Sequence, residues 1–444
     1  MIRHARIITI CLVLLSMSFC FSSAALAGEP RRITLEEAWA LAIGSNEDVR
    51  IAAEGVRQSG FSINKATSKI LPTVTAEGSY TMYTEEKSSG SFVTQPDNAS
   101  KMEIKVTQPL YSGGREWANR RQARYGYESS REGFELAKDG TALSTAKAYY
   151  SILKALRDFE IKKSALKRAD ERKKVASARF AVGDVTKSAV LRAEAESAGA
   201  EAELIKAKEN LRDSKDSLKR LIGVDGDFEV VEPSARSYGA GSLEEHIAKA
   251  VEGRRDLRQA ALSERSATEG VKYARGSFYP SLKLDGSYSV REQDPETTFF
   301  QADSASATVT LTFPIFEGFL RKAELDEASS KLREAELEKL SLRRDIEVEV
   351  RDAYNNLEYF KAVIESLEKR LSFAEEDYTM VFEQFKYGLA TTVDVIDADA
   401  NLISAQSSLM NARYDSELAI LNLKYATGTM SEETAKAANE NDHP

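Results

Sequence analysis

The chain is almost free of the side chains on which metal sites and covalent catalysis depend. Its only cysteines, Cys11 and Cys20, lie in the first 27 residues, and only His246 and His443 follow that segment. The rest of the chain therefore offers no disulfide, thiolate metal site or cysteine nucleophile, and its two histidines lack metal-ligand spacing. A phosphate-binding Gly-Lys-Ser/Thr loop is also absent. We expect a protein that is not an enzyme and that binds no cofactor and no metal.

Long apolar runs are absent too, except near the start. Arg3 and Arg6 precede an apolar stretch, and Ala25-Leu26-Ala27 has the pattern of a cleavage site. We therefore expect residues 1–27 to be a secretory signal peptide. A membrane anchor is the alternative, but the stretch is shorter than the ~20 apolar residues of a spanning helix. Lipidation of Cys20 is a further alternative, which the bulky residue before it disfavours.

Beyond residue 27 the sequence offers neither a membrane-spanning helix nor an excess of positive charge. No later stretch is apolar and long enough to span a bilayer, so the chain could cross a membrane only as β-strands. The formal net charge is −9, and it becomes −11 without the two arginines of residues 1–27. This negative balance argues against a nucleic-acid partner.

The positions without proline predict two long helices. No proline falls between residues 109 and 233, or between 314 and 444, and an interior proline would break a helix. Seventy residues separate Gly113 from Gly183, and again Gly318 from Gly388, which corresponds to ~100 Å of helix. The second gap holds an unbroken heptad pattern, typical of a helix packed along partner helices. Its members are Val350, Ala353, Leu357, Phe360, Ile364, Leu367, Leu371, Ala374, Tyr378, Val381 and Phe385.

The chain repeats itself at a nearly constant interval. Leu71-Pro72 returns 208 residues later as Tyr279-Pro280. A constant interval over more than a hundred residues indicates an internal duplication. Further along the interval is 205, and it relates Gly113 to Gly318, Ala148-Tyr149 to Ala353-Tyr354, Gly183 to Gly388 and Gly223 to Gly428.

Each copy contains two short segments in which apolar and polar residues alternate. Each has about the ~10 residues of a tilted membrane-spanning strand, with an apolar face for lipid and a polar face for a lumen. A soluble hairpin with one buried face is the alternative that this pattern leaves open. The segments are 73–82, 102–110, 281–291 and 306–315, and the polar loops 85–101 and 292–305 join them in pairs.

Shorter helices complete each copy. Thr34–Glu37 and Ser242–Glu245 have the sequence of capping boxes, which predict helices over about 34–70 and 242–278. Returning helices are expected after the two turn glycines. Each returning helix is about half as long as the long helix before it. One returning helix and one of the helices that precede the strands, stacked end to end, would therefore cover the length of a long helix. The returning helices are expected over about 185–222 and 390–427.

These elements divide the chain into two repeats with short flanking segments. The stretch between the repeats holds several glycines and a proline and is expected to be a linker. The segment after the second repeat is polar and is expected to be a flexible tail. The divisions are 1–27 (signal peptide), 28–223 (first repeat), 224–241 (linker), 242–428 (second repeat) and 429–444 (tail).

Four strands per chain require partners. The smallest membrane barrels have about eight strands, and lipid does not tolerate an open sheet edge. The chain must therefore pool its strands with other copies of itself. Both strand pairs leave the membrane on the side of the helices, so the helices project into the compartment below and form a tube. Taken alone, the heptads would also fit a structural coiled coil without a pore.

The sequence resembles the TolC-type outer-membrane efflux proteins over nearly its whole length, about residues 33–428. The matching segments are Ile33–Ala38, Leu71-Pro72, Gln108–Gly114, Phe385–Leu389 and Val393–Ala398. The resemblance implies an α+β membrane protein and a homotrimer, with one twelve-stranded outer-membrane barrel to which each chain gives four strands. It also implies that a twelve-helix coiled-coil tunnel continues this barrel across the periplasm of a Gram-negative bacterium.

The resemblance also implies partners. A channel of this family docks onto a periplasmic adaptor (a membrane fusion protein) and an inner-membrane pump of the RND or ABC type, which supplies the energy. We therefore expect a passive exit duct for efflux or type I secretion. The alternative is an exported soluble coiled-coil scaffold, or a periplasmic adaptor, without a pore.

Asp394 and Asp397 are the candidate gate residues. They are three apart and so lie on one face of the returning helix, just beyond Gly388. In the family that the chain resembles, aspartates at the matching positions ring the narrow periplasmic entrance. Three copies would bring six carboxylates together, which attract cations. The alternative is an ordinary surface pair, with Asp394 favoured by the helix dipole. Asp399 is a further candidate.

The two helix–helix turns are the candidate adaptor contacts. Glycine permits the tight turn in each, and the resemblance implies that these tips meet the helical hairpin of the adaptor. The residues are Val182, Gly183 and Asp184 in the first turn, and Tyr387, Gly388 and Leu389 in the second.

The sequence departs from the family at the contact that closes the tunnel. Where the best-known member has a tyrosine and an arginine on the second hairpin, this chain has Phe385 and Ala390. Ser188 and Ala189 stand at the positions opposite. A different closing contact is therefore expected, with Lys187 and Asp184 as candidates.

Overall fold

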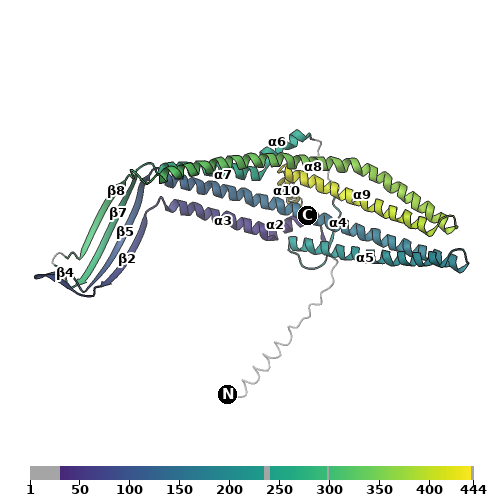
Figure 1. The fold of residues 1–444 in the computed structure, drawn as a ribbon, viewed down its shortest axis with the longest axis horizontal. Helices are drawn as coiled ribbons and strands as arrows, with labels where there is room; N and C mark the ends of the chain where they lie inside the picture. The colour runs from purple at the N-terminus through teal and green to yellow at the C-terminus, as the bar shows by residue number, and fades with distance from the viewer. Residues whose placement is uncertain (1–30, 235–240, 298–299, 442–444) are drawn as a thin grey trace, which may run out of the picture.

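The computed structural model describes residues 31–234, 241–297 and 300–441. The expected signal peptide, with both cysteines, lies outside the described residues. The described chain is elongated, with a β-sheet at one end and bundled helices over the remaining length (Figure 1). Within these ranges, no helix combines the length and the apolar composition of a membrane span.

The expected strands form one antiparallel sheet. β2 (Thr73–Met82), β5 (Asn98–Ser112), β7 (Ser281–Asp294) and β8 (Asp303–Thr312) lie in that order. The two hairpins, one from each repeat, join through β5 and β7, where Ile104 pairs with Tyr288. β8 ends at Thr312, before Pro314, although the alternating pattern predicts a strand to residue 315. Within the first predicted loop, β3 (Lys87–Ser89) and β4 (Phe92–Gln95) form a small separate hairpin.

Two uninterrupted helices run from the sheet to the far tip. α4 (Arg115–Ala181) and α8 (Leu320–Lys386) have 67 residues each, which is ~100 Å. α3 (Glu47–Ser68) and α7 (Arg255–Gly276) pack along them near the sheet, and α5 (Lys187–Ile222) and α9 (Thr392–Ala426) pack along them near the tip (Figure 1). The predicted end-to-end arrangement of short helices beside long ones is therefore confirmed.

The helix before each strand pair is broken, which the sequence pattern does not indicate. α2 (Leu35–Ser45) is separated from α3 at Asn46, and α6 (Leu243–Gly253) from α7 at Arg254. Both break residues have extended backbone. Asn46 caps α3 by accepting a hydrogen bond from the Asp48 amide, and Arg254 forms ion pairs with Asp256 and Glu349. The prediction of single helices over 34–70 and 242–278 is wrong for this reason.

The two predicted capping boxes differ. Ser242 and Glu245 form a complete box, in which each side chain accepts from the backbone amide of the other residue. Thr34 accepts from the Glu37 amide, but the Glu37 side chain forms an ion pair with Arg31. Only half of the first box is therefore formed as predicted.

An apolar core with several aromatic side chains lies at mid-length, where the short helices meet. β1 (Arg31–Ile33) pairs in parallel with β6 (Phe228–Val230), which belongs to the predicted linker. The Tyr149 hydroxyl of α4 lies 2.9 Å from the Ile33 carbonyl oxygen and accepts a hydrogen bond from the Val231 amide at 3.0 Å. Tyr149, which the 205-residue interval relates to Tyr354, is thus a core residue of the first repeat.

The expectation of a flexible tail is wrong for most of that segment. Met430–Asn441 form helix α10, which contacts α2 and α4. Met430 is fully buried in the mid-length core, and Lys424 forms a 2.6 Å ion pair with Glu433. The buried side chain of Met430, the first residue of α10, therefore attaches this polar segment to the mid-length core.

The junction between sheet and helices requires close backbone approach. Gly113 has φ +66°, and a Cβ built on it would lie 2.2 Å from the Gly276 carbonyl oxygen. The next residue, Gly114, has φ +79°, but a Cβ there would meet nothing within 4 Å. The two neighbouring glycines thus share a left-handed backbone and differ in the space around them.

We expect Gly113→Ala to destabilise the protein more than Gly114→Ala. Both changes place a side chain in the left-handed region, which costs ~1–2 kcal/mol. Only Gly113→Ala adds a clash, worth a further ~1–3 kcal/mol. Thermal unfolding of the two variants in detergent, followed by circular dichroism, measures the difference. Equal losses for the two variants would show that the close approach to Gly276 does not matter.

Candidate functional site

The two helix–helix turns lie together at the end of the molecule farthest from the sheet (Figure 1). Gly183 has φ +80° and Gly388 has φ +78°, so both turns use the left-handed backbone that favours glycine. Val182, Tyr387 and Leu389 are 81%, 79% and 79% exposed. These side chains gain nothing from packing within one chain and are available to a partner.

Arg179 joins the two tips. Its Nε donates to Asp184 Oδ2 at 2.7 Å, and its Nη1 donates to the Phe385 carbonyl oxygen at 2.7 Å. The guanidinium also lies 5.2 Å from the centre of the Phe385 ring. Asp184 thus binds an arginine of its own hairpin, and that arginine contacts the second hairpin. The sequence analysis missed Arg179.

Phe385 is buried at the tip. It packs in an apolar cluster contributed by both hairpins, which includes Ala176, Tyr378, Val395 and Leu402, with Ala390 at its margin. The two positions at which the chain departs from the family pattern thus lie in or against apolar core.

Asp394 caps α9. Its Oδ2 accepts hydrogen bonds from the Thr391 amide at 2.8 Å and from the Thr391 hydroxyl at 2.7 Å, and Thr391 in turn caps the Asp394 amide. The hydroxyl first, and then the amide, stabilise the carboxylate and lower the pKa of Asp394 below its usual value. Asp394 is therefore an acid at the start of a helix, which the sequence analysis kept as the alternative to a gate residue. Its side chain is also exposed.

Asp397 is exposed one turn further along α9, on the same face as Asp394. Asp399 is not part of this pair. Two residues along a helix correspond to a rotation of ~200°, so Asp399 points to the opposite side. Its residue exposure is 3%. The structure thus brings Asp394 and Asp397 together and separates Asp399 from them.

Asp399 instead binds two arginines of the first hairpin. Its Oδ1 accepts from Arg168 Nε at 2.6 Å, and its Oδ2 accepts from Arg172 Nη1 at 2.7 Å. The Arg172 side chain is 2% exposed. The Arg168 guanidinium lies 5.5 Å from the ring centre of Tyr378, and burial first, then nearby Asp399, raises the pKa of that phenol. This buried triplet ties α9 to α4 about three turns above the tips.

A sequence signal for this triplet exists. Arg168 and Arg172 are four apart and so share one face of α4. Pairing them with Asp399, however, requires knowing that α4 and α9 are neighbours. Among the described residues, no group of three or more histidine, cysteine, aspartate or glutamate side chains could hold a metal ion.

We expect Asp399→Asn to destabilise the protein by ~3–5 kcal/mol, because it leaves two arginines buried without a counter-charge. The matched control is Asp397→Asn, an exposed position two residues away, for which we expect a change within ~0.5 kcal/mol. Denaturant-induced unfolding in detergent measures both. A small effect at Asp399 would mean that water or rearrangement compensates the triplet.

Two comparisons at the level of sequence place the chain among known proteins. The family model described as "Outer membrane efflux protein" matches residues 39–224 and 246–429, once in each repeat. The chain is 25% identical to outer membrane protein TolC of Vibrio cholerae over 412 residues, which cover 89% of the chain and 90% of the relative. It is 24% identical to outer membrane efflux protein BepC of Brucella suis, with 90% and 86% covered.

Solved structures show the same fold. The Campylobacter jejuni CmeC outer membrane channel superposes with a TM-score of 0.80 at 19% identity, covering 92% of this chain and 89% of that one. VceC of Vibrio cholerae, an outer membrane protein, has a TM-score of 0.76 at 20% identity, with 89% and 96% covered. The expected fold class is confirmed: a four-stranded sheet continued by a long helical part, as in these outer-membrane proteins.

The family decides between the two functions that the sequence analysis left open. Its members are outer-membrane channels with a periplasmic part, which are trimeric and work with adaptor and pump partners. This excludes the scaffold without a pore. Because the family model matches both repeats, over far more than half of the sequence, the chain belongs to the outer membrane efflux protein family and is an outer-membrane channel of a Gram-negative bacterium.

Proposed function

We propose that three copies of this chain form the exit duct of a tripartite efflux or type I secretion system, and that Asp394 and Asp397 narrow its periplasmic entrance. The pump partner is of the RND or ABC type. The relatives include an efflux protein, BepC, and the alkaline protease secretion protein AprF of Pseudomonas aeruginosa, at 23% identity. The observation that supports the gate is that two exposed carboxylates lie on one face of α9, next to the tip.

The adaptor binds at the tips in this proposal. Val182, Tyr387 and Leu389 are exposed apolar side chains on rigid turns, while Arg179 holds Asp184 and the second hairpin in fixed positions. Apolar side chains presented by rigid turns suit a protein partner, because ordering them on binding costs little entropy. Gly183 and Gly388 make these turns possible. The whole segments Val182–Asp184 and Tyr387–Leu389 are therefore the proposed contact.

The proposed gate is electrostatic. A trimer would place six carboxylates around the axis, and the hydrogen bonds from Thr391 keep Asp394 ionised to lower pH than an ordinary aspartate. Asp399 neutralises arginines of its own chain and does not contribute to this ring. The ring would bind divalent cations and obstruct the current.

We expect Asp394→Asn combined with Asp397→Asn to raise single-channel conductance and to relieve block by divalent cations in planar bilayers. Asparagine keeps the size of the side chain and an oxygen that caps Thr391, so the change removes charge with little loss of the helix start. Glu334→Gln with Glu338→Gln, exposed carboxylates of α8 far from the tip, is the control. Unchanged currents in the aspartate variant would reject the gate, and an absence of any current from the wild-type protein would reject the duct.

The pH dependence of the block gives a separate prediction. The block is present while Asp394 is ionised and disappears as the pH falls through its pKa. Thr391→Val removes the hydroxyl that most lowers this pKa, so the pKa rises and the block should be lost at a higher pH than in the wild type. Thr391→Ser keeps the hydroxyl and should behave as the wild type. A shift in the opposite direction, or equal shifts in both variants, would contradict the assignment.

A further inference from the structure

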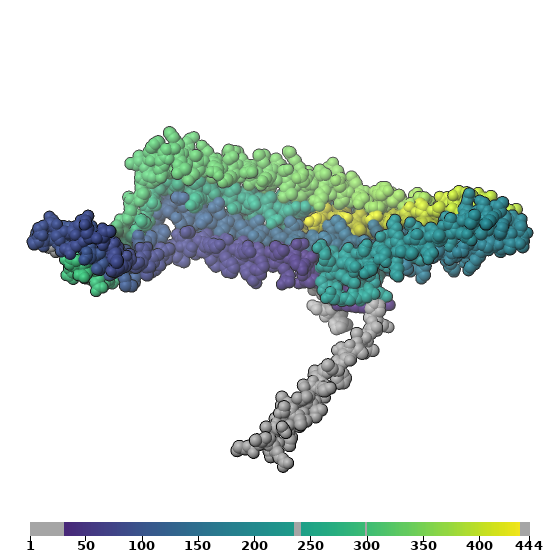
Figure 2. Space-filling view, turned by 60° about the horizontal axis from the view of Figure 1, so that its bottom comes forward, coloured from purple at the N-terminus to yellow at the C-terminus, as the bar shows by residue number. Residues whose placement is uncertain are grey.

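The half of the helical part next to the sheet carries a groove on one of its faces. There α3 packs along α4, α4 along α7, and α7 along α8 (Figures 1 and 2). The groove has a volume of about 830 Å³ and is lined by residues of α3, α4 and α7. Because α4 lies between the other two helices, it forms the base of the groove. All three belong to one copy, so no neighbouring copy is needed to shape the groove.

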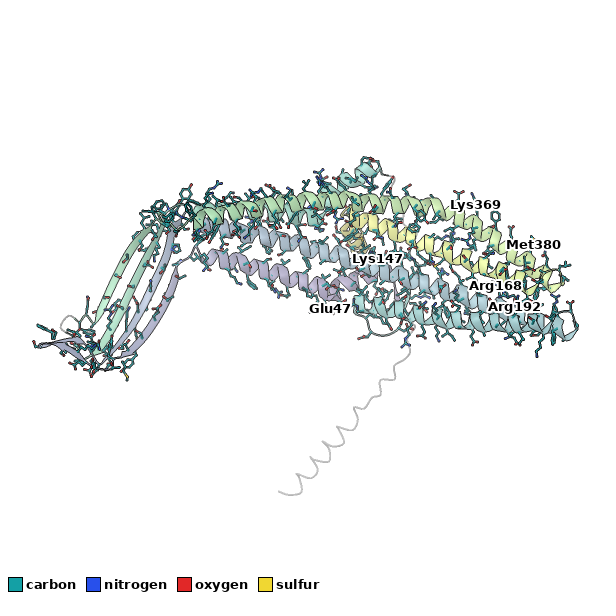
Figure 3. The ribbon with its side chains drawn as sticks, in the orientation of Figure 1. Glu47, Lys147, Arg168, Arg192, Lys369 and Met380 are labelled. Atoms are coloured by element: carbon teal, nitrogen blue, oxygen red, sulfur yellow. The ribbon has the colours of Figure 1, made fainter. Side chains whose placement is uncertain are left out.

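The face of α4 that carries this groove also carries the additional helices at mid-length. Glu135 of α4 lines the groove and lines a second cavity between α2, α4 and α10. The groove therefore continues, toward the sheet, the surface on which α2 and α10 pack. Glu47 lies at the mid-length end of α3, where the two regions meet (Figure 3). In a ring of three copies, helices packed on the inner face would fill the tunnel, so this face is the outer one.

Part of the groove lining is apolar. Val56 of α3, Phe134 of α4, and Ala261 and Leu262 of α7 contribute to it. Each of these side chains is half-buried within one copy, so part of its apolar surface stays in contact with water. Covering that surface with apolar side chains of a partner would favour association.

The carboxylates that line the groove are already balanced by cations of the same chain. Each of the three has a basic side chain beside it, so the groove keeps little unbalanced negative charge. The pairs are Glu128 with Arg124 at 3.0 Å, Glu132 with Arg255 at 3.6 Å, and Glu135 with Lys138 at 3.0 Å.

Three arginines of the groove have no acidic partner among the residues that the structure describes. Arg131 of α4 and Arg265 of α7 form neither an ion pair nor a hydrogen bond with any of those residues. Arg258 of α7 donates a hydrogen bond to the Glu252 carbonyl oxygen at 3.3 Å. All three arginines are exposed. The groove therefore combines apolar surface with unbalanced positive charge.

These three arginines stand at two heights along the groove. Gln259 donates to the Ser129 carbonyl oxygen at 3.0 Å, which puts Arg131 level with Arg258 to within about one residue, since α4 and α7 are antiparallel. Arg265 lies two turns nearer the sheet, ~10 Å away. One small anion cannot reach both heights. A helix with carboxylates seven positions apart can, because those positions share one face and are also ~10 Å apart.

The chain already docks one helix on this face by the same two kinds of contact. α10 attaches through the buried apolar side chain of Met430, and its Glu433 pairs with Lys424 of α9 at 2.6 Å. The groove offers an apolar surface and guanidinium groups, which bind carboxylates strongly because two parallel hydrogen bonds form. A second acidic helix would therefore find there what α10 finds at mid-length.

We propose that this arginine groove, defined by Arg131, Arg258 and Arg265, binds a short acidic amphipathic helix of a periplasmic protein. Apolar residues of that helix cover Val56 and Ala261, and carboxylates seven positions apart bind the arginines at the two heights. The groove lies in the half of the molecule next to the sheet, so it is a separate site from the contact proposed at the tips. The proposal rests on the ring of three copies, which places the groove on the outside.

Two fluorescent peptides of about 14 residues, or four turns, test the groove in the purified channel in lipid nanodiscs. Both have leucines on one face. The acidic peptide has glutamates seven positions apart beside that face, and the basic peptide has lysines at the same positions. Fluorescence anisotropy, with empty discs as the blank, should show at least tenfold tighter binding of the acidic peptide. This preference should shrink as salt is added, because ions screen exposed charges.

Arginine variants show whether the groove is the site. Arg131→Gln with Arg265→Gln should weaken binding of the acidic peptide at least tenfold. The matched control is Arg333→Gln with Arg344→Gln, exposed arginines of α8 outside the groove, and should bind as the wild type. Arg131→Glu with Arg265→Glu should reverse the preference, so that the basic peptide binds more tightly than the acidic one.

A further variant tests the apolar surface without changing charge. Ala261→Phe fills part of the groove and should also weaken the acidic peptide. Equal binding of the two peptides by the wild type, or equal weakening by the two arginine-to-glutamine pairs, would overturn the arginine groove. Binding of polyglutamate as tightly as the acidic peptide would show a site for polyanions in general and would overturn the helix as its occupant.

Conductance of the same preparations separates this proposal from the proposed function. A wild-type channel that conducts but does not prefer the acidic peptide would refute the groove alone. A wild-type protein that binds the acidic peptide but carries no current would refute the duct and leave the groove intact. The groove variants should conduct as the wild type, because the groove lies outside the tunnel.

Discussion

A single copy of this chain leaves two kinds of edge without a partner, and this constraint governs the rest of the structure. At one end, β2 and β8 have unpaired backbone on their outer sides. At the other, α8 and α5 present apolar and small side chains to the outside. Unpaired strand edges cannot persist in lipid. In a closed ring of copies, one rotation brings the edges at both ends of each copy against the edges of the next copy.

The internal duplication gives one chain two similar halves, with long helices of equal length. Each repeat supplies a strand hairpin and a long helical hairpin, and the two turn glycines stand at the same distance from the sheet. The repeats have diverged in the side chains that they expose near the tips, with Phe373 and Met380 on α8 of the second, and Leu191 and Ile205 among several alanines on α5 of the first.

Within one chain, the two helical hairpins are joined by few polar contacts of high specificity. The buried triplet of Asp399 with Arg168 and Arg172, and the contacts of Arg179 at the tip, both lie between α4 and the second hairpin. Replacing a buried ion pair by apolar residues is often neutral for stability, so such a pair is better understood as a device that selects one alignment. Sliding either hairpin by one turn would leave these arginines buried without partners.

Local patterns were sufficient for the elements themselves. Alternation indicated the strands, proline gaps and heptads indicated the two long helices, and the interval between glycines placed both turns, because each depends on residues close in sequence. That Asp394 and Asp397 share one face of α9 also followed from helical spacing alone, whereas their exposure is known only from the structure. The tertiary structure decided the breaks at Asn46 and Arg254, the attachment of α10 through Met430, and the pairing of Asp399 with two arginines more than 220 residues away. Those features depend on which elements become neighbours, and contacts between distant parts of a chain leave no periodic signal in its sequence.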